Sequence, residues 1–390
     1  MKNKLKLAVL VDVSRAYDRD LLTGFSNFNK IHDKFIFFSF SPQYIHSDNQ
    51  ATLFKRLIAW KPDGVFTREI NGFKRLLDLD IPFIISPHTH LYKDKINLWG
   101  PNKAIGEIAA EYFISKGYKN YAFLGFKNFQ WSLERQEGYV ERTNRPGHTL
   151  NTFIFDNTSL LWEHLPARLT EWLAMLEKPC AVFSATDELN IHLLDAAKQL
   201  GLKVPDDFSI IGVDNDTMIC DMASPTLSSI EHNAKQAGFQ AALALSRWIE
   251  YGEKPACDIV TGPATIVTRN STNILAIDDE HVRSALYYIA NMALSEDISV
   301  DDVVKATVLS RRVLEKKFQL VIKSSILGEI RKTRIERIKF LLVNSELTVQ
   351  QIANELNFRN FDNITRYFKQ FTGLKPLEYR NKFARSKTIF

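Results

Sequence analysis

The chain of 390 residues contains little cysteine. Its three cysteines, Cys180, Cys220 and Cys257, are odd in number and lie far apart in the sequence. This spacing predicts neither a framework of disulfide bonds nor a metal site built on thiolates. A reducing compartment suits such a chain. We therefore expect a cytoplasmic protein that needs no disulfide bond and no metal ion.

Long apolar runs are also lacking. No stretch approaches the ~20 consecutive apolar residues that a membrane-spanning helix requires. The apolar stretch at residues 4–13 is short, Asp12 interrupts it, and no small-residue cleavage site follows it. This stretch therefore differs from a secretion signal, and we expect no membrane partner.

The sequence lacks the short motifs that are typical of several enzyme classes. It has no G-x-G-x-x-G loop, no P-loop, no G-x-S-x-G elbow and no His or Cys cluster with metal-ligand spacing. We therefore predict that the protein is not an enzyme and binds no cofactor. One alternative remains, because Asp187 and Asp214 would suit the paired carboxylates of a sugar-active enzyme. Turnover of a bound sugar would favour that alternative.

Charge is distributed unevenly along the chain. From Val303 to the end there are 19 Lys and Arg residues against 7 Asp and Glu residues. The remaining residues carry 31 basic and 38 acidic side chains, so a basic segment follows a slightly acidic one. A basic segment favours a polyanionic partner, because neutralised phosphates release counterions. A solvated basic surface without a partner is the alternative.

Strand patterns alternate with helix patterns over the first two thirds of the chain, which predicts parallel sheets covered by helices. The pattern restarts near residue 102, so we expect two α/β lobes of similar build. The expected strands are 4–13, 35–40, 64–67, 82–86, 121–126, 153–155, 181–185, 209–214 and 264–269, and the expected helices are 18–29, 52–60, 72–79, 104–116, 166–176, 188–200 and 233–251.

Strand patterns stop after Ser271, and helix patterns continue from His281 to the end. We therefore predict two domains, residues 1–275 and 280–390. Within the first, the N-lobe is expected at about 1–101 and 229–255, and the C-lobe at about 102–228 and 256–275.

Two helix pairs of similar layout occur in the second domain, at residues 299–319 and 348–371. Ser299 and Asp302 predict a capping box at the start of the first pair, and Ser310 is placed to cap its second helix. Asn357 occupies the turn of the second pair, where a left-handed residue is needed. A basic amphipathic helix, 330–342, connects the two pairs. The domain is therefore predicted to be all-α, with two helix-turn-helix units.

Tandem helix-turn-helix units suit DNA, since each second helix can enter the major groove with Arg facing guanine and Asn facing adenine. A connector of ~18 residues spans ~27 Å, close to one turn of DNA. An all-helical packing domain is the alternative, which the tandem arrangement and the basic connector disfavour. The candidate DNA-binding residues are Arg311, Arg312, Glu315, Lys316, Asn360, Asp362, Asn363 and Arg366.

The stretch IANELNF followed by ITRYFKQFTGLKPLEYR resembles the AraC-type regulators. The matching positions are Phe358, Arg366, Phe368, Lys369, Gly373, Pro376, Tyr379 and Arg380. Departures from the family pattern are Asn357 for a glycine, Asn363 for a frequent aromatic residue, and Val308 for a glycine in the first unit. Because valine rarely adopts a positive φ, we expect the first turn to be built differently.

The first domain resembles the LacI-type regulators and the type I periplasmic-binding-protein fold. The resemblance rests on residues 109–125, ERQEGY at 134–139, SATDELN at 184–190, GVDND at 212–216, PTLSSI at 225–230 and TRNST at 268–272. Gly100, Pro101 and Asn102 depart from the pattern at the crossing between lobes. The resemblance implies a two-lobed sensor domain that binds a sugar in its cleft.

A LacI-like sensor ahead of an AraC-type domain resembles the xylose-operon activators of the XylR type. The stretch AYDR at residues 16–19 and the lack of an N-terminal helix-turn-helix support this. The resemblance implies a D-xylose-dependent activator with an operator DNA, a sugar and RNA polymerase as partners. A homodimer is expected, because it doubles the half-sites contacted. A different pentose, a hexose or a uronate is the alternative effector.

A sugar offers neighbouring hydroxyls to guanidinium and carboxylate groups, and an apolar face to aromatic rings. Arg135, Asp187 and Asp214 follow strand patterns, at the sheet edge where cleft ligands bind. The resemblance implies that these three bind the sugar hydroxyls. Further candidates are Asp18, Arg19, Glu134 and Asn215, with Tyr17 and Trp131 to stack on the sugar. Salt bridges and core packing are the alternative roles.

Overall fold

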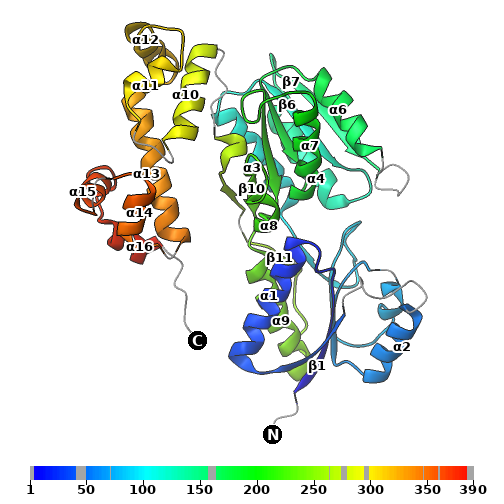
Figure 1. Ribbon diagram of the computed structural model, residues 1–390. Helices are drawn as coiled ribbons and strands as arrows, with labels where there is room; N and C mark the ends of the chain where they lie inside the picture. Colours follow the sequence, from blue (N-terminus) through cyan, green and yellow to red (C-terminus); the bar gives the residue numbers. More distant parts are fainter. Residues whose placement is uncertain are drawn as a thin grey trace. The chain divides into compact units, whose positions relative to one another are not determined.

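The computed structural model describes residues 4–40, 50–70, 72–156, 164–262, 264–273, 279–293, 298–345, 347–358 and 361–383. The chain divides into two compact units, residues 1–272 and 273–390, which we call the N-terminal and C-terminal units. The N-terminal unit contains two α/β lobes, and the C-terminal unit is helical (Figure 1). The fold class predicted from the sequence is confirmed.

The first lobe is built on a six-stranded sheet of order β11-β5-β4-β3-β1-β2, with all neighbours parallel. Helices α1 (Ala16–His32) and α9 (Ala234–Tyr251) lie side by side on one face, and α2 (Gln50–Trp60) covers the other (Figure 1). The strands are β1 (Leu5–Leu10), β2 (Phe35–Phe40), β3 (Gly64–Arg68), β4 (Phe83–Ser86), β5 (Ile96–Trp99) and β11 (Ile259–Val260).

Strand β1 shows why this sheet is apolar on both faces. Leu7 and Val9 pack against α1 and α9, whereas Ala8 and Leu10 pack against residues of α2 on the opposite face. Successive side chains of a strand point to opposite faces, so a sheet with helices on both sides requires a continuous apolar run.

The sequence predicts a helix over residues 72–79, and the predicted length is wrong. Only one turn of 3-10 helix, η3 (Phe73–Leu76), forms there. It starts after Gly72, whose φ of +80° lies in the left-handed region. Strand β4 begins soon afterwards behind Pro82, and a proline disfavours helix in the residue before it. Little chain is therefore left for a longer helix.

The second lobe has a six-stranded sheet of order β12-β10-β9-β8-β6-β7, in which only the β10–β12 pairing is antiparallel. Helices α3 and α4 lie side by side on one face, and α6 and α7 cover the other (Figure 1). The strands are β6 (Asn120–Phe126), β7 (Thr149–Phe155), β8 (Cys180–Ser184), β9 (Phe208–Val213), β10 (Ser228–Glu231) and β12 (Thr265–Val267). The helices are α3 (Asn102–Ser115), α4 (Gln130–Thr143), α6 (Leu165–Met175), α7 (Asp187–Gln199), α8 (Thr217–Cys220) and η4 (Asn270–Thr272).

Two strands correct the lobe boundaries expected from the sequence. Strand β10 (Ser228–Glu231) belongs to the second sheet, so the chain does not return to the first lobe at residue 229. Strand β11 (Ile259–Val260) pairs with β5 in the first sheet, although the sequence predicts residues 256–275 in the second lobe. Both strands are too short to show a periodicity of their own.

The described part of the C-terminal unit is built from helices. Its helices are α10 (Glu280–Met292), α11 (Val300–Lys305), α12 (Arg311–Val321), α13 (Ile326–Asn344), α14 (Val349–Glu355), α15 (Phe361–Thr372) and α16 (Pro376–Phe383). The first half of α13 packs Ile326 and Ile330 among α10, α11 and α12. Its second half packs Ile335 and Ile338 among α14, α15 and α16. Two small apolar cores therefore share one connecting helix.

The two helix-turn-helix turns differ as the sequence predicted. Asn357 has a φ of 54°, so it supplies the left-handed turn of the second pair. Val308 has no positive φ, and its side chain is 88% exposed. The capping box of Ser299 and Asp302 is confirmed. Ser310 lies at the N-cap of α12, but the prediction that it caps this helix is wrong, because its side chain makes no capping hydrogen bond.

None of the helices in the described ranges combines the length and the apolar character that crossing a membrane requires.

Candidate ligand cleft and nucleic-acid interface

A cavity of about 430 Å³, part of it open to solvent, lies between the two lobes of the N-terminal unit. Arg68 ends β3, Ser86 ends β4 and Asp214 follows β9, and all three line the cavity. The cavity therefore occupies the carboxyl ends of parallel strands, where α/β folds bind ligands. Other lining residues are Arg15, Tyr17, Trp99, Asn102, Trp131, Arg135, Thr186 and His232.

Asp214 is the carboxylate of the cavity wall. Its Oδ1 accepts a hydrogen bond from His232 Nε2 at 2.9 Å, and Arg135 Nη2 lies 3.8 Å away. Burial raises the pKa of Asp214, but the hydrogen bond from His232 and the charge of Arg135 outweigh burial and hold the pKa below its ordinary value. Asp214 is therefore an ionised acceptor at neutral pH. Its Oδ2 accepts no hydrogen bond from the described part of the chain.

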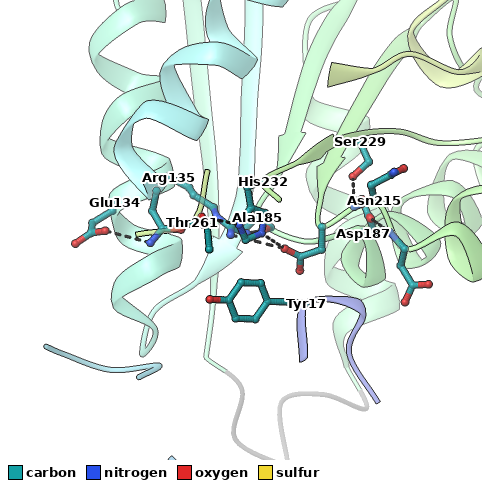
Figure 2. Close-up of polar contacts among 12 residues, drawn as sticks. Tyr17, Glu134, Arg135, Ala185, Asp187, Asn215, Ser229, His232 and Thr261 are labelled. Atoms are coloured by element: carbon teal, nitrogen blue, oxygen red, sulfur yellow. Dashed lines mark hydrogen bonds and ion pairs between the residues drawn. The ribbon is translucent and has the colours of Figure 1, made fainter. Parts of the chain in front are cut away.

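Arg135 is held rigidly although it is charged and only 4% exposed. Its Nε donates to Asn102 Oδ1 at 3.1 Å, and its Nη1 donates to the carbonyl of Ala185 at 2.5 Å. Its guanidinium group lies over the ring of Trp131, 5.0 Å from the centroid. These contacts leave Nη2 near Asp214, so Arg135 has a fixed direction in the wall of the cavity (Figure 2).

Two glycines allow helix α4 to bring Arg135 to this position. A Cβ on Gly138 would lie 2.0 Å from the carbonyl oxygen of Lys103, and one on Gly106 would lie 2.1 Å from the carbonyl oxygen of Arg135. Helices α3 and α4 can therefore approach each other closely only because both positions lack a side chain. The sequence pattern predicts Arg135 just after a strand, whereas it lies inside α4.

Aromatic rings from both lobes border the cavity. Tyr17 stacks on His232, with ring centroids 5.1 Å apart and planes 16° apart. Figure 2 shows Tyr17 facing the group formed by Arg135 and His232. Trp131 is buried, and its Nε1 has no hydrogen-bond partner among the described residues. The cavity thus combines flat apolar surfaces with an indole donor.

Asp18 does not line the cavity but supports a residue that does. Its Oδ1 lies 3.2 Å from Arg68 Nε, and both side chains are buried. Arg68 also donates to Ser86 Oγ at 2.8 Å. Burial raises the pKa of Asp18 to about 6, although the charge of Arg68 opposes this shift. Asp18 therefore titrates near neutrality behind the cavity wall.

Three other candidates bind protein groups. Asp187 Oδ2 accepts from the backbone N–H of Asp216 at 2.9 Å, and burial raises the pKa of Asp187 well above its ordinary value. Glu134 accepts from Trp99 Nε1 at 3.1 Å. The backbone N–H of Asn215 donates to Ser229 Oγ at 2.9 Å.

Arg19 is also absent from the lining of the cavity. Its Nη2 pairs with Asp216 Oδ2 at 2.6 Å. Of the nine predicted sugar-binding residues, the structure brings Tyr17, Trp131, Arg135 and Asp214 into the cavity wall. Direct contact with a sugar stays a prediction for all nine.

Several lining residues were missed by sequence reasoning. Arg68 ends β3, one residue after the predicted end of that strand at Thr67. His232 follows β10, whose four residues SSIE gave no strand signal. Both side chains obey the rule that site residues follow parallel strands. Arg68 would have been found by extending the predicted strand β3 by one residue, and His232 by treating the short polar segment SSIE as a strand.

The predicted DNA-binding side chains lie on α12 and α15. Arg312, Lys316 and Arg366 are exposed. Arg311 is exposed too, but it pairs with Glu315 Oε1 at 2.9 Å and with Asp301 Oδ1 at 3.2 Å. The other residues of the prediction are Glu315 and Asp362, which are exposed, Asn363, which is half-buried, and Asn360, which lies outside the described residues.

Two arginines of the basic segment have structural roles. Arg334 is buried, and its Nη2 donates to the carbonyl of Leu356 at 2.7 Å. Arg380 donates through Nε to the carbonyl of Leu342 at 2.9 Å and through Nη2 to that of Leu347 at 2.6 Å. These carbonyls lie at the ends of α13 and α14 or beside them, where intrahelical donors are lacking. The excess of basic residues therefore overstates the charge available to a partner.

Two family profiles match this chain. The family described as a periplasmic binding protein-like domain matches residues 110–272, and the family described as a helix-turn-helix domain matches residues 303–382. The chain joins a periplasmic-binding-protein-like domain to a helix-turn-helix domain.

Some of the matching proteins cover nearly the whole chain. The xylose operon regulatory protein of Escherichia coli (strain K12) is 27% identical over 390 residues, covering 96% of this chain and 97% of the relative. That of Haemophilus influenzae is 24% identical over 408 residues, covering 96% and 98%. The solved structure of the xylose-binding transcription activator xylR is similar to this chain, with a TM-score of 0.75 at 24% identity, covering 98% of this chain and 100% of that chain. The resemblance inferred from the sequence is confirmed.

Proposed function

We propose that this protein is a transcription regulator whose DNA binding responds to a sugar, and that the sugar is D-xylose. The observation that carries the proposal is the cavity between the lobes, where ionised Asp214 lies beside Arg135 and the aromatic rings of Tyr17 and Trp131. The names of the full-length relatives support xylose as the effector. Another pentose, a hexose or a uronate is the alternative. Because the proposed partner is chromosomal DNA, we expect the protein to act in the cytoplasm.

The wall of the cavity offers complementary groups to a sugar. Asp214 Oδ2 accepts from a hydroxyl, while Arg135 Nη2 and Trp131 Nε1 donate to hydroxyl oxygens. The rings of Tyr17 and Trp131 border the cavity and offer apolar contact to the C–H groups of the sugar. A cavity that lies between two lobes and is lined by aromatic rings and a few polar groups suits one small ligand. Because these polar groups are buried, a sugar that lacks one matching hydroxyl leaves a group unpaired and binds less tightly.

The exposed helices of the C-terminal unit are the proposed DNA readers. Helix α13 has 19 residues, so it spans about 28 Å between the two helix pairs. This length approaches the ~34 Å that separates successive major-groove faces. We propose that α12 and α15 each enter the major groove, with Arg366 directed toward the bases. A homodimer would double the half-sites contacted, and activation would require contact with RNA polymerase.

Calorimetry on the full chain tests the sugar. The titrants are D-xylose, L-arabinose, D-ribose, D-glucose and D-glucuronate, and each sugar is recovered afterwards to check that it is unchanged. We expect D-xylose to bind most tightly and to remain unconverted. Tighter binding of another sugar would replace xylose as the effector, and conversion of a bound sugar would contradict the regulator proposal.

Arg135→Ala connects the binding to this cavity. We expect sugar affinity to fall by at least about 30-fold, because removing one partner of a buried charged hydrogen bond costs about 2–5 kcal/mol. The matched control is Arg142→Ala, which removes an exposed arginine of the same helix α4 that pairs with Glu107 at 3.5 Å. Circular dichroism checks that both variants are folded. Equal affinity of Arg135→Ala and Arg142→Ala would place the ligand elsewhere.

A DNA fragment selected from a random library by the full chain tests the second half of the proposal. We expect the affinity for this fragment to change when D-xylose is added, and a fragment that the chain does not select serves as the control. A chain that selects no DNA sequence would contradict a role in transcription.

A further inference from the structure

The turn that follows β9 connects the cavity to a contact between the lobes. Asp214, whose carboxylate lines the cavity, has a φ of 98°, and Asn215 has a φ of 49°. Two consecutive non-glycine residues with positive φ cost free energy and persist only where surrounding contacts hold them. Asp216 follows directly. A ligand bound at Asp214 therefore acts on a turn whose shape is held by its neighbours.

Asp216 joins the two lobes at the end of this turn. Its Oδ2 accepts from Nη2 of Arg19, a residue of α1 in the first lobe, at 2.6 Å. Arg19 is oriented by its Nη1, which donates to the carbonyls of Val13 at 3.1 Å and Ser14 at 2.6 Å. The Asp216 side chain is only 5% exposed, so the pair is better shielded from water than a surface salt bridge.

Helix α8 starts at the same carboxylate. Asp216 is the N-cap of α8, and its Oδ1 accepts from the backbone N–H of Met218 at 3.1 Å. The backbone N–H of Asp216 also donates to Asp187 Oδ2 at 2.9 Å. One side chain therefore fixes the start of α8 and holds the first lobe.

The other end of α8 is bonded to the last segment of the N-terminal unit. Asp221 is the C-cap of α8, and its Oδ1 accepts from Arg269 Nε at 2.7 Å. Arg269 Nη1 donates to the carbonyl of Leu227 at 3.0 Å, and the backbone N–H of Leu227 donates to the carbonyl of Cys220 at 2.9 Å. Arg269 immediately precedes η4 (Asn270–Thr272).

This last segment is firmly held. Ser271 and Thr272 are completely buried. Ser271 Oγ donates to the carbonyl of Ile210 at 2.6 Å and accepts from the backbone N–H of Ser228 at 2.8 Å. Thr272 Oγ1 lies 2.7 Å from the hydroxyl of Tyr112. Element η4 therefore lies between Arg269 and the C-terminal unit, which begins at residue 273.

We infer that the turn Asp214–Asp216 and helix α8 form a relay that carries closure of the lobes to the segment leading into the C-terminal unit. In the structure Arg19 contacts Asp216 and fixes the start of α8, a bound ligand holds the lobes in this closed arrangement, and Asp221 passes the constraint to Arg269. The inference rests on the proposed function for the identity of the closing ligand. Arg19 and Asp221 are positioning residues, because they act through α8.

Hydrogen exchange measured by mass spectrometry on the full chain, without ligand, tests the relay directly. We expect Arg19→Ala to speed exchange about fivefold at the backbone N–H groups of α8 and of residues 269–272, because local opening follows the removal of a tertiary interaction. Asp221→Asn should speed exchange at residues 269–272. Arg142→Ala, which removes an ion pair within one lobe, is the control and should change neither segment. Faster exchange of α8 in Arg19→Ala with residues 269–272 unchanged would overturn the relay.

DNA affinity with and without D-xylose supplies the functional measurement. We expect Asp221→Asn to bind D-xylose with the parent affinity, since Asp221 lies outside the cavity lining. Its sugar-dependent change in DNA affinity should fall to about one third or less of the parent change, which corresponds to weaker coupling between the two sites. A full response in Asp221→Asn would contradict the relay. If the parent binds no D-xylose, the sugar assignment fails, and the exchange measurement still decides the relay.

Discussion

The two units of the chain present the arginines of their candidate binding sites in opposite ways. In the N-terminal unit, Arg68 and Arg135 are buried, and each makes several hydrogen bonds to the protein. In the C-terminal unit, Arg312 and Arg366 project from α12 and α15 into solvent. The buried arginines have their directions fixed before any ligand arrives. We expect the exposed ones to lose side-chain freedom when a partner binds.

This difference gives the two units different kinds of binding: specificity for a small ligand in the N-terminal unit, and electrostatic attraction to DNA in the C-terminal unit. A pre-oriented group loses little conformational entropy on binding, so a small change in the ligand alters the affinity strongly. Exposed basic groups are attracted by the phosphates, and this part of the binding depends on salt and not on sequence, whereas hydrogen bonds to bases add the sequence preference. We therefore expect the N-terminal unit to discriminate sharply among small ligands, and the C-terminal unit to show strong salt dependence.

Phe368→Ala gives the largest effect we expect and tests whether the units are independent. Phe368 is completely buried in the core shared by α13, α14 and α15. Truncating such a phenylalanine costs about 3–5 kcal/mol, because apolar burial is reduced and a cavity is left behind. Calorimetric unfolding of the full chain should show a lower transition for the C-terminal unit and an unchanged transition for the N-terminal unit.

Phe371→Ala is the matched control for this variant. Phe371 lies on the same helix α15 but is 41% exposed, so its truncation should shift the transition much less. If Phe368→Ala lowered the unfolding transitions of both units equally, the two units would not be independent of each other.

Asp18→Asn tests the cost of burying charge in the N-terminal unit. The pKa of Asp18 is raised to about 6 in the folded protein, mainly by burial. Between its unfolded value of about 4 and this value, the folded state binds more protons than the unfolded state, so stability falls as pH rises. The raised pKa corresponds to a loss of at most about 3 kcal/mol, complete above pH 6. The substitution should remove this part of the pH dependence.

Chemical denaturation between pH 4 and pH 7 provides the measurement. The control is Asp33→Asn, which changes an exposed aspartate paired with Lys4. Its stability should follow the parent curve over the same range. An unchanged slope in Asp18→Asn would mean that Arg68 keeps Asp18 ionised throughout and that burial has little effect.

The sequence predicted the parts of the cavity that follow long, apolar strands. Asp214 follows β9, whose six residues are all buried, and the strand pattern there is clear. His232 follows β10, in which three of four residues are serine or glutamate. The sequence therefore did not predict a strand there, and His232 was not recognised as a residue that follows one. Arg135 was found by resemblance, because its position depends on the close packing of α3 and α4 around Gly106 and Gly138. Contacts made by distant segments leave no local signal.

In the C-terminal unit, the sequence predicted the turns better than the roles of the charged side chains. The left-handed turn at Asn357 follows from the preference of asparagine for positive φ. The structural roles of Arg334 and Arg380 were not predictable, because their partners are carbonyls of Leu356, Leu342 and Leu347 on other elements. A count of basic residues does not distinguish an arginine that ends a helix from one that faces solvent.

Arg366→Ala and Arg311→Ala give the smallest effects and sharpen the comparison within the C-terminal unit. Arg366 is exposed on α15 and has no ion-pair partner among the residues that the structure describes, whereas Arg311 already pairs with Glu315 and Asp301. We expect Arg366→Ala to weaken binding of the selected DNA fragment by about 10- to 100-fold, as removal of a hydrogen bond to a base does. Arg311→Ala should cost less, because binding DNA through Arg311 requires breaking ion pairs that it already makes.

Fluorescence anisotropy over a series of salt concentrations separates the two possible roles of Arg366. If Arg366 binds a base, Arg366→Ala reduces the preference for the selected fragment over random DNA. If Arg366 binds a phosphate, the substitution weakens both equally and lowers the salt dependence by about one unit of slope. A larger effect for Arg311→Ala than for Arg366→Ala would reverse the ranking of the two helix pairs. It would also mean that the ion pairs of Arg311 orient its side chain for DNA binding and do not compete with DNA.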